Sequence, residues 1–216
     1  MENKTKQLTT LAMLAAIALV VTLFIRISFM PGAPFLVYDP KDVVIVVAGL
    51  MFGPLAAFIL AIVVAFVEMI TVSHSGIIGM LMGAMASITF ACPAAFLYKH
   101  SNTLKSAVVG LVLGMLAATG TMILWNYLII PLYTGMPREA VVGMLVPIIL
   151  PFNLIKTGLN ASIAMLVYKP ITKALKTAKL YAPSRQNAAP NKGFNIAVVL
   201  VSAFVLLSLI LLAVTL

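Results

Sequence analysis

A polar stripe crosses an otherwise apolar stretch, Pro147-Ile-Ile-Leu-Pro-Phe-Asn153-Leu-Ile-Lys156-Thr157-Gly-Leu-Asn160. At about 100° per residue, a helix places its Asn, Lys and Thr side chains within a sector roughly 100° wide. Lys156 lies about 14 Å into this segment at helical rise. An ammonium group at that depth costs at least about 2.5–3.5 kcal/mol if it meets lipid. Lys156 must therefore either pair with a carboxylate of a neighbouring helix or line a site for a polar ligand.

The composition around this stretch is that of an all-α integral membrane protein. Hydrophobic residues make up 63% of the 216 residues, and charged residues make up 9%. The net charge of +9 comes from cations that gather between apolar runs. In that position they indicate topology rather than nucleic-acid binding, and they predict a cytoplasmic N-terminus in a multi-pass protein of the cell membrane. No small-residue cleavage site follows the first apolar run, so we expect a retained helix.

The apolar runs predict seven helical spans, at roughly 8–28, 42–52, 54–72, 78–98, 106–130, 147–168 and 194–216. The run from 43 to 72 is divided at Gly53-Pro54, because two spans there keep both basic loops, 99–105 and 169–185, on the inner side. The first of these two spans, at about 16 Å, is too short to cross the membrane alone.

The spans group into a six-helix membrane domain at 1–175, a basic cytoplasmic linker at 176–193 and an additional transmembrane helix at 194–216. The last helix carries no polar stripe. A P-loop motif is absent from the sequence, so we expect no nucleotide-binding domain of that type. Cys92, the single cysteine, excludes an intramolecular disulfide and is expected in the core.

Two loops and their neighbours complete the outer side. The segment 29–42 has three prolines and a glycine, which predict a loop. Its apolar residues suggest that this loop folds over another group rather than into solvent. Asp42 is expected to cap the next helix. A second outer loop is expected at 131–146. His74 is expected to be solvated, since no partner stands at metal-ligand spacing. Met80, Met82 and Met85 are expected in the core.

With this topology, several polar residues converge in the outer half of the membrane. They are Tyr38, Asp39, Lys41, Glu68, Asn126, Asn153 and Lys156. A polar cluster open to one side predicts a binding pocket rather than a channel, which needs a lining across the whole bilayer. Glu68 could equally form an ion pair with Lys156. Motifs of membrane hydrolases are absent, so we expect no enzyme and no metal site.

The order of these features resembles the substrate-binding (S) subunit of an energy-coupling factor (ECF) vitamin transporter of the riboflavin type. The resemblance covers roughly residues 8–175 and rests on four motifs, Tyr38-Asp39-Pro40-Lys41-Asp42, Phe52-Gly53-Pro54-Leu55-Ala56, Asn126-Tyr127-Leu-Ile-Ile-Pro131 and Leu150-Pro151-Phe152-Asn153-Leu154-Ile155-Lys156. It implies a six-helix bundle that binds a vitamin from outside. The partners that it implies are a membrane coupling subunit and two cytoplasmic ATPase subunits.

The resemblance also implies roles for individual residues. Asn126, Asn153 and Lys156 would bind the edge of the isoalloxazine ring, while residues 29–42 would form a lid. Ala12 and Ala16 have the spacing of a first-helix motif that docks the coupling subunit. Independently of the resemblance, the ring is flat and amphipathic, so the aromatic side chains of Tyr38, Trp125, Tyr127 and Phe152 could pack on its faces.

The third span departs from the family pattern, because Val64-Ala65 stand where relatives of the riboflavin type often carry a lysine-asparagine pair. A pyridoxine-like or other ring compound therefore remains an alternative ligand. A membrane interaction protein, in which a Lys156–Glu68 pair fixes the helix register, is the alternative from a different class.

Overall fold

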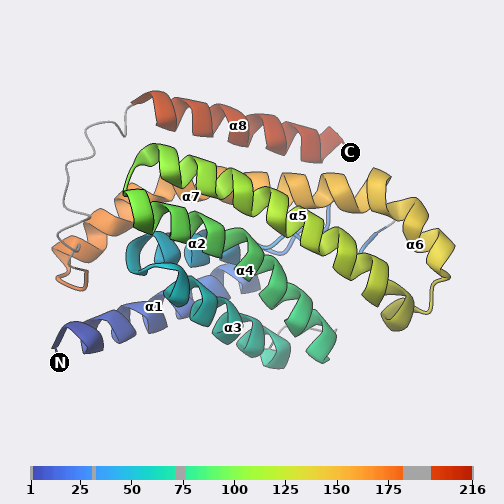
Figure 1. Ribbon diagram of the computed structural model, residues 1–216, viewed down its shortest axis with the longest axis horizontal. Helices are drawn as coiled ribbons and strands as arrows, with labels where there is room; N and C mark the ends of the chain where they lie inside the picture. The colour runs from blue at the N-terminus through green and yellow to red at the C-terminus, as the bar shows by residue number, and fades with distance from the viewer. Residues whose placement is uncertain (1, 31–32, 72–75, 182–195, 216) are drawn as a thin grey trace.

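The computed structural model describes residues 2–30, 33–71, 76–181 and 196–215. The helices in chain order are α1 (Glu2–Phe24), α2 (Lys41–Phe52), α3 (Pro54–Thr71), α4 (Gly76–Ser101), α5 (Leu104–Thr134), α6 (Arg138–Met144), the π-helical turn η1 (Leu145–Ile149), α7 (Leu150–Thr177) and α8 (Ile196–Thr215). Figure 1 shows them as one elongated bundle, with α8 along its outside. The predicted all-α fold is confirmed.

Helix α2 occupies the centre of the bundle. Its residues from Lys41 to Met51 are all buried, and Ile45 and Val46 have no exposed surface. At about 18 Å the helix is shorter than the hydrocarbon core of a membrane. It ends at Phe52 and is capped by Gly53, whose φ of +97° favours glycine, and α3 starts at Pro54. The predicted division of the apolar run at Gly53-Pro54 is therefore correct.

The C-terminal end of α2 packs against aromatic residues of other elements. Tyr181, after the end of α7, packs edge-on against Phe52 at 5.4 Å between ring centroids. Tyr98 of α4 and Tyr168 of α7 share a hydrogen bond of 3.1 Å between their hydroxyl oxygens. This end of the bundle is thus closed by packed side chains, whereas the opposite end is hollow.

The connection between α5 and α7 is shorter than the sequence predicts. Pro131 lies inside α5, which continues to Thr134, and helical structure resumes at Arg138. The predicted loop at 131–146 is wrong because Val141 and Ile149 are completely buried in a second apolar cluster with Phe152, which holds this segment in helical turns. Similarly, α1 begins at Glu2 and ends at Phe24, four residues before the predicted end of its span.

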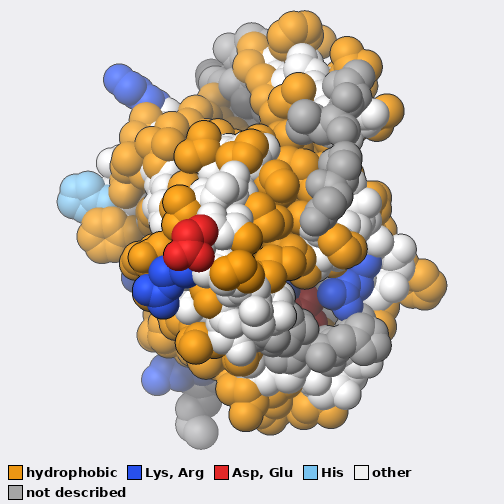
Figure 2. Space-filling view, turned by 90° about the vertical axis from the view of Figure 1, so that its right-hand side faces the viewer, with side chains coloured by type: hydrophobic (Ala, Val, Ile, Leu, Met, Phe, Trp, Pro, Cys, Tyr) orange, Lys and Arg blue, Asp and Glu red, His pale blue; other side chains and the backbone are white. Residues whose placement is uncertain are grey.

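The outside of the molecule is suited to lipid. Five described helices are long and apolar enough to cross a membrane, and α8 supplies a shorter apolar stretch at Val199–Val214. Figure 2 shows a mainly hydrophobic surface with few charged groups. The linker predicted at 176–193 lies outside the described residues beyond position 181, as does His74. The protein is therefore a multi-pass membrane protein.

Candidate functional site

A polar cavity of about 200 Å³ lies at the end of the bundle where α5 meets α6. Its walls come from the segment after α1, the first residue of α2, the last turns of α3 and α5, and the first turns of α4 and α7. Figure 2 looks onto this end of the molecule. Acidic side-chain atoms are visible there in a hollow, set back from the surface beside basic side-chain atoms. Elements distant in sequence therefore bring their polar residues to one place.

Six of the eight residues predicted to bind the ligand line this cavity. They are Asp39, Lys41, Glu68, Asn126, Asn153 and Lys156. The other two predicted residues lie elsewhere, as described below.

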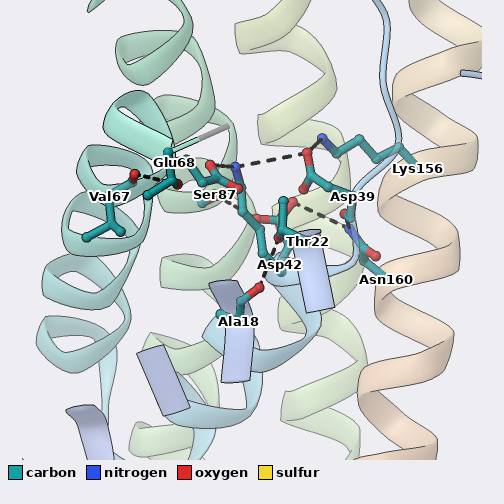
Figure 3. A network of polar contacts seen from close by, with 11 residues as sticks. Ala18, Thr22, Asp39, Asp42, Val67, Glu68, Ser87, Lys156 and Asn160 are labelled. Atoms are coloured by element: carbon teal, nitrogen blue, oxygen red, sulfur yellow. Dashed lines mark hydrogen bonds and ion pairs between the residues drawn. The ribbon is translucent and has the colours of Figure 1, made fainter. Parts of the chain in front are cut away.

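Ion pairs connect the charged residues of the cavity wall (Figure 3). The Lys156 ammonium lies 3.3 Å from Asp39 Oδ2, and the Lys41 ammonium lies 4.0 Å from the same oxygen. Lys41 also forms a hydrogen-bonded ion pair with Glu68. The Lys156–Glu68 pair, given above as an alternative, is wrong, because α2 places Lys41 in front of Glu68 and the preceding loop places Asp39 in front of Lys156.

The two lysines stabilise the ionised form of the Asp39 carboxyl group. Burial raises the pKa of its carboxyl group, but the nearby Lys156 and Lys41 ammonium groups outweigh burial and keep the pKa below its usual value. Asp39 Oδ1 is buried and has no hydrogen-bond partner within the described part of the chain. One oxygen of this carboxylate is thus engaged by lysines while the other is unsatisfied.

Two asparagines direct their carbonyl oxygens away from the helix backbone. The amide nitrogen of Asn126 donates to the carbonyl of Met122 at 2.6 Å, and that of Asn153 donates to the carbonyl of Ile149 at 2.8 Å. A carbonyl only accepts, so the nitrogen end of each side chain must face it. The carbonyl oxygen of each side chain is therefore the atom left to accept a hydrogen bond from a ligand.

The remaining members of the polar stripe make contacts inside the protein, and only Asn160 connects α7 to other elements. Asn160 is completely buried, accepts from the Tyr38 hydroxyl at 3.1 Å and donates to Asp42 at 3.4 Å. Thr157 donates to the carbonyl of Asn153 at 2.6 Å. The stripe is consequently divided, with Asn153 and Lys156 at the cavity and the other two residues in internal contacts.

Asp42 is part of this internal network rather than a helix cap. Pro40 is the N-cap of α2, and Asp42 lies one residue inside the helix, where it is 2% exposed. It accepts hydrogen bonds from Ser87 of α4 and from Asn160. The predicted capping role is wrong because α2 begins at Lys41, two residues before the start that a cap at Asp42 requires, and the carboxylate faces α4 and α7.

Two predicted ligand-binding tyrosines do not line the cavity. Tyr38 packs with Ile155 and Leu159 in an apolar cluster. Tyr127 carries the guanidinium of Arg138 over its ring, 5.1 Å from the centroid. Trp125 is also absent from the lining, whereas Phe35 and Phe152 belong to it. Of the four aromatic residues expected on a flat ligand, only Phe152 therefore lies at the cavity, where Phe35 joins it.

Sequence reasoning missed several lining residues. Arg26 falls within the predicted first span, 8–28, but α1 ends two residues before it and Arg26 lines the cavity. Met80 and Met82, expected in the core, line the cavity together with Met69 and Met122. The signal was present as a high methionine content, 13 residues in the whole chain, since methionine is typical of adaptable binding surfaces.

Two other expectations concern groups outside the cavity. Ala12 and Ala16 are exposed on α1, whereas Leu14, Ala15 and Ala18 face the core. Cys92 is half-buried, with its sulfur 3.7 Å from the carbonyl oxygen of Pro54. Among the described residues, none of the His, Cys, Asp and Glu side chains form a group of three that could hold a metal ion.

A helical membrane protein with a polar cavity at one end of its bundle has the architecture of a solute-binding subunit. The family described as ECF transporter, substrate-specific component, matches residues 6–168. This chain therefore belongs to the substrate-specific components of ECF transporters, as its motifs indicated.

Several relatives are riboflavin transporters. FmnP of Bacillus subtilis is 33% identical over 191 residues, which cover 82% of this chain and 100% of the relative. RibU of Staphylococcus aureus is 32% identical over 182 residues, covering 81% and 94%. A solved S component of a bacterial ECF transporter superposes with a TM-score of 0.68 at 31% identity, covering 80% of this chain and 99% of that one. These relatives are named as transport proteins.

Proposed function

We propose that this chain is the riboflavin-binding S subunit of an ECF-type importer and takes the vitamin from the outer side of the membrane. Relatives named as riboflavin transporters, matched over nearly their whole length, support this choice of ligand. The observation that carries the proposal is that Asn126 of α5 and both Asn153 and Lys156 of α7 belong to the cavity wall.

The hydrogen-bonding pattern of this wall suits the polar edge of a flavin. Lys156 donates, and the carbonyl oxygens of Asn126 and Asn153 accept. The pyrimidine-like edge of isoalloxazine alternates carbonyl acceptors with an N–H donor, so it can satisfy both kinds of group. Asp39 Oδ1, buried without a partner in the described residues, is available to a further N–H or O–H donor of the ligand.

The remaining walls suit the faces of a planar ring. Phe35, Phe152, Met80, Met82 and Met122 line the cavity. Aromatic and thioether groups stack on flat ligands, and methionine adapts to their outline. The ligand in this proposal is cargo and not a cofactor of a reaction.

The importer requires partners that the chain itself does not contain. We assign ATP hydrolysis to two cytoplasmic ATPase subunits and their connection to this chain to a membrane coupling subunit. Ala12 and Ala16, exposed on α1 at a spacing of four residues, provide a small-residue surface for that subunit. In this arrangement the N-terminus is cytoplasmic, because the basic loops lie on the inner side.

Purification in detergent tests the ligand. Protein from cells grown in rich medium is expected to carry flavin absorbance, and stripped protein is expected to quench riboflavin fluorescence on binding. Binding of a pyridoxine-like compound in place of riboflavin would assign the site to that alternative ligand. A protein that binds neither compound would instead favour a purely structural role of the ion pairs.

A further inference from the structure

Helix α8 follows the region that defines the family. The family match ends at residue 168, whereas α8 spans Ile196–Thr215. Figure 1 shows α8 running along the outside of the bundle, with its C-terminal end towards the end of the molecule that holds the cavity. The family match therefore says nothing about the role of α8.

One face of α8 packs against residues beside the cavity. Leu206, Leu209 and Ala213, spaced as one helical face, join the apolar cluster that contains Tyr38, Ile155 and Leu159. The approach is close at Gly158, where an added Cβ would lie 2.8 Å from Leu209 Cδ1. The α7 surface beneath α8 is therefore shaped for this contact.

The residues under α8 are directly linked to the polar site. Tyr38 precedes Asp39, donates its hydroxyl to Asn160, and exchanges backbone hydrogen bonds of 3.1 and 2.8 Å with Ile27. On α7, Ile155 and Leu159 each precede a residue of the polar stripe, Lys156 and Asn160. A contact that fixes Tyr38 against α7 thus also fixes the distance between Asp39 and Lys156.

We propose that α8 is a brace for the binding site: its Leu206–Leu209 face positions Tyr38 and the loop that carries Asp39, and so slows the release of the ligand. The proposal rests on the function proposed above. The residues of this face are positioning residues, since they act through Tyr38 and do not line the cavity.

The opposite face of α8 offers a matched control. Leu200 and Leu207 are 62% and 66% exposed, whereas Leu206 and Leu209 are half-buried against the bundle. A helix that serves only as a membrane anchor depends on its overall apolarity. A brace depends on the inward face, so leucine-to-alanine changes on the two faces separate these roles.

The test uses the full-length chain, stripped and reloaded with riboflavin, in lipid nanodiscs. Leu206→Ala combined with Leu209→Ala is expected to raise the dissociation rate of riboflavin about fivefold or more. The rate is measured as the recovery of riboflavin fluorescence after dilution. Leu200→Ala combined with Leu207→Ala is expected to leave the rate unchanged. Equal rates for the two double variants would overturn the brace, whereas a wild-type protein that binds no riboflavin would overturn the proposed function itself.

A second measurement separates positioning from general loss of stability. In a Tyr38→Ala background, the inward-face variant is expected to add little further increase in dissociation rate, because the residue through which α8 acts is gone. Gly158→Val provides an independent route to the same result by displacing Leu209, should the double variant fold poorly. Additive effects of Tyr38→Ala and the α8 changes would contradict the proposal.

Discussion

Lys156 is tolerated inside an apolar bundle because a carboxylate lies close to it. Asp39 stands 3.3 Å from its ammonium group, although the two residues are 117 positions apart in the chain. A cation held by one charged partner at a cavity wall retains donors for a ligand. At the scale of the residue, Lys156 is thus the centre of the proposed binding chemistry.

Replacement of this lysine should weaken ligand binding. Lys156→Ala removes a charge-assisted hydrogen bond, and we expect a loss of about 2 kcal/mol in riboflavin affinity, measured by fluorescence quenching. Lys173→Ala is the control, because Lys173 lies on the same helix but is exposed at the opposite end. Unchanged affinity of the Lys156 variant would remove this residue from the site.

Asp39 should matter for stability as well as for binding. Asp39→Asn leaves Lys156 and Lys41 without the carboxylate between them, and breaking a buried ion pair costs about 3 kcal/mol. We expect a lower thermal unfolding temperature of the empty protein in detergent. The double variant Asp39→Asn, Lys156→Met should lose less than the sum of the single changes. Fully additive losses would mean that the pair is not coupled.

At the scale of the elements, close packing between α4 and α5 holds one side of the cavity together. A Cβ on Gly114 would lie 2.1 Å from the carbonyl oxygen of Phe90, so a larger residue must push the helices apart. Small residues at such contacts let membrane helices approach closely. The cavity residues of α4 and α5 therefore depend on glycine at a distance from the site.

The addition of a single methyl group at Gly114 should test this contact. Gly114→Ala is expected to destabilise the fold by about 1–3 kcal/mol, as overpacking does, and to reduce the yield of monodisperse protein in size-exclusion chromatography. Gly120→Ala, on the same helix, meets nothing within 4 Å and should behave as the wild type. Equal behaviour of the two variants would show that α4 and α5 can separate without cost.

For the whole molecule, the charge distribution fixes the expected orientation in the membrane. Lys99, Lys105 and Lys173 belong to the end opposite the cavity, near the cluster of Tyr98, Tyr168 and Tyr181. The bias of basic residues towards the cytoplasm predicts that this end lies inside and the cavity outside. A subunit that captures an external solute requires the same orientation.

Cysteine labelling of intact cells should reveal this orientation. In a Cys92→Ala background, Met136→Cys is expected to react with a membrane-impermeant maleimide, because Met136 is exposed near the cavity end. Lys105→Cys should react only after the cells are permeabilised. The opposite pattern would reverse the proposed topology, and with it the direction of uptake.

The sequence by itself determined the features that depend on local pattern and on the membrane as solvent. Apolar runs of sufficient length gave the helices, and Gly53-Pro54 marked the break between α2 and α3. The polar stripe of α7 identified Lys156, since a charge within an apolar helix is costly wherever its partner lies. These signals lie within one helix or one turn, so they are readable without the fold.

The tertiary structure alone decided which distant groups meet. It paired Lys156 with Asp39 and Lys41 with Glu68, turned Asn153 towards the cavity and Asn160 into the core, and brought methionines of α3, α4 and α5 to the lining. It also continued α5 through Pro131 and laid α8 against α7. Such choices depend on packing between elements far apart in the chain, and the local pattern of residues carries no information about that packing.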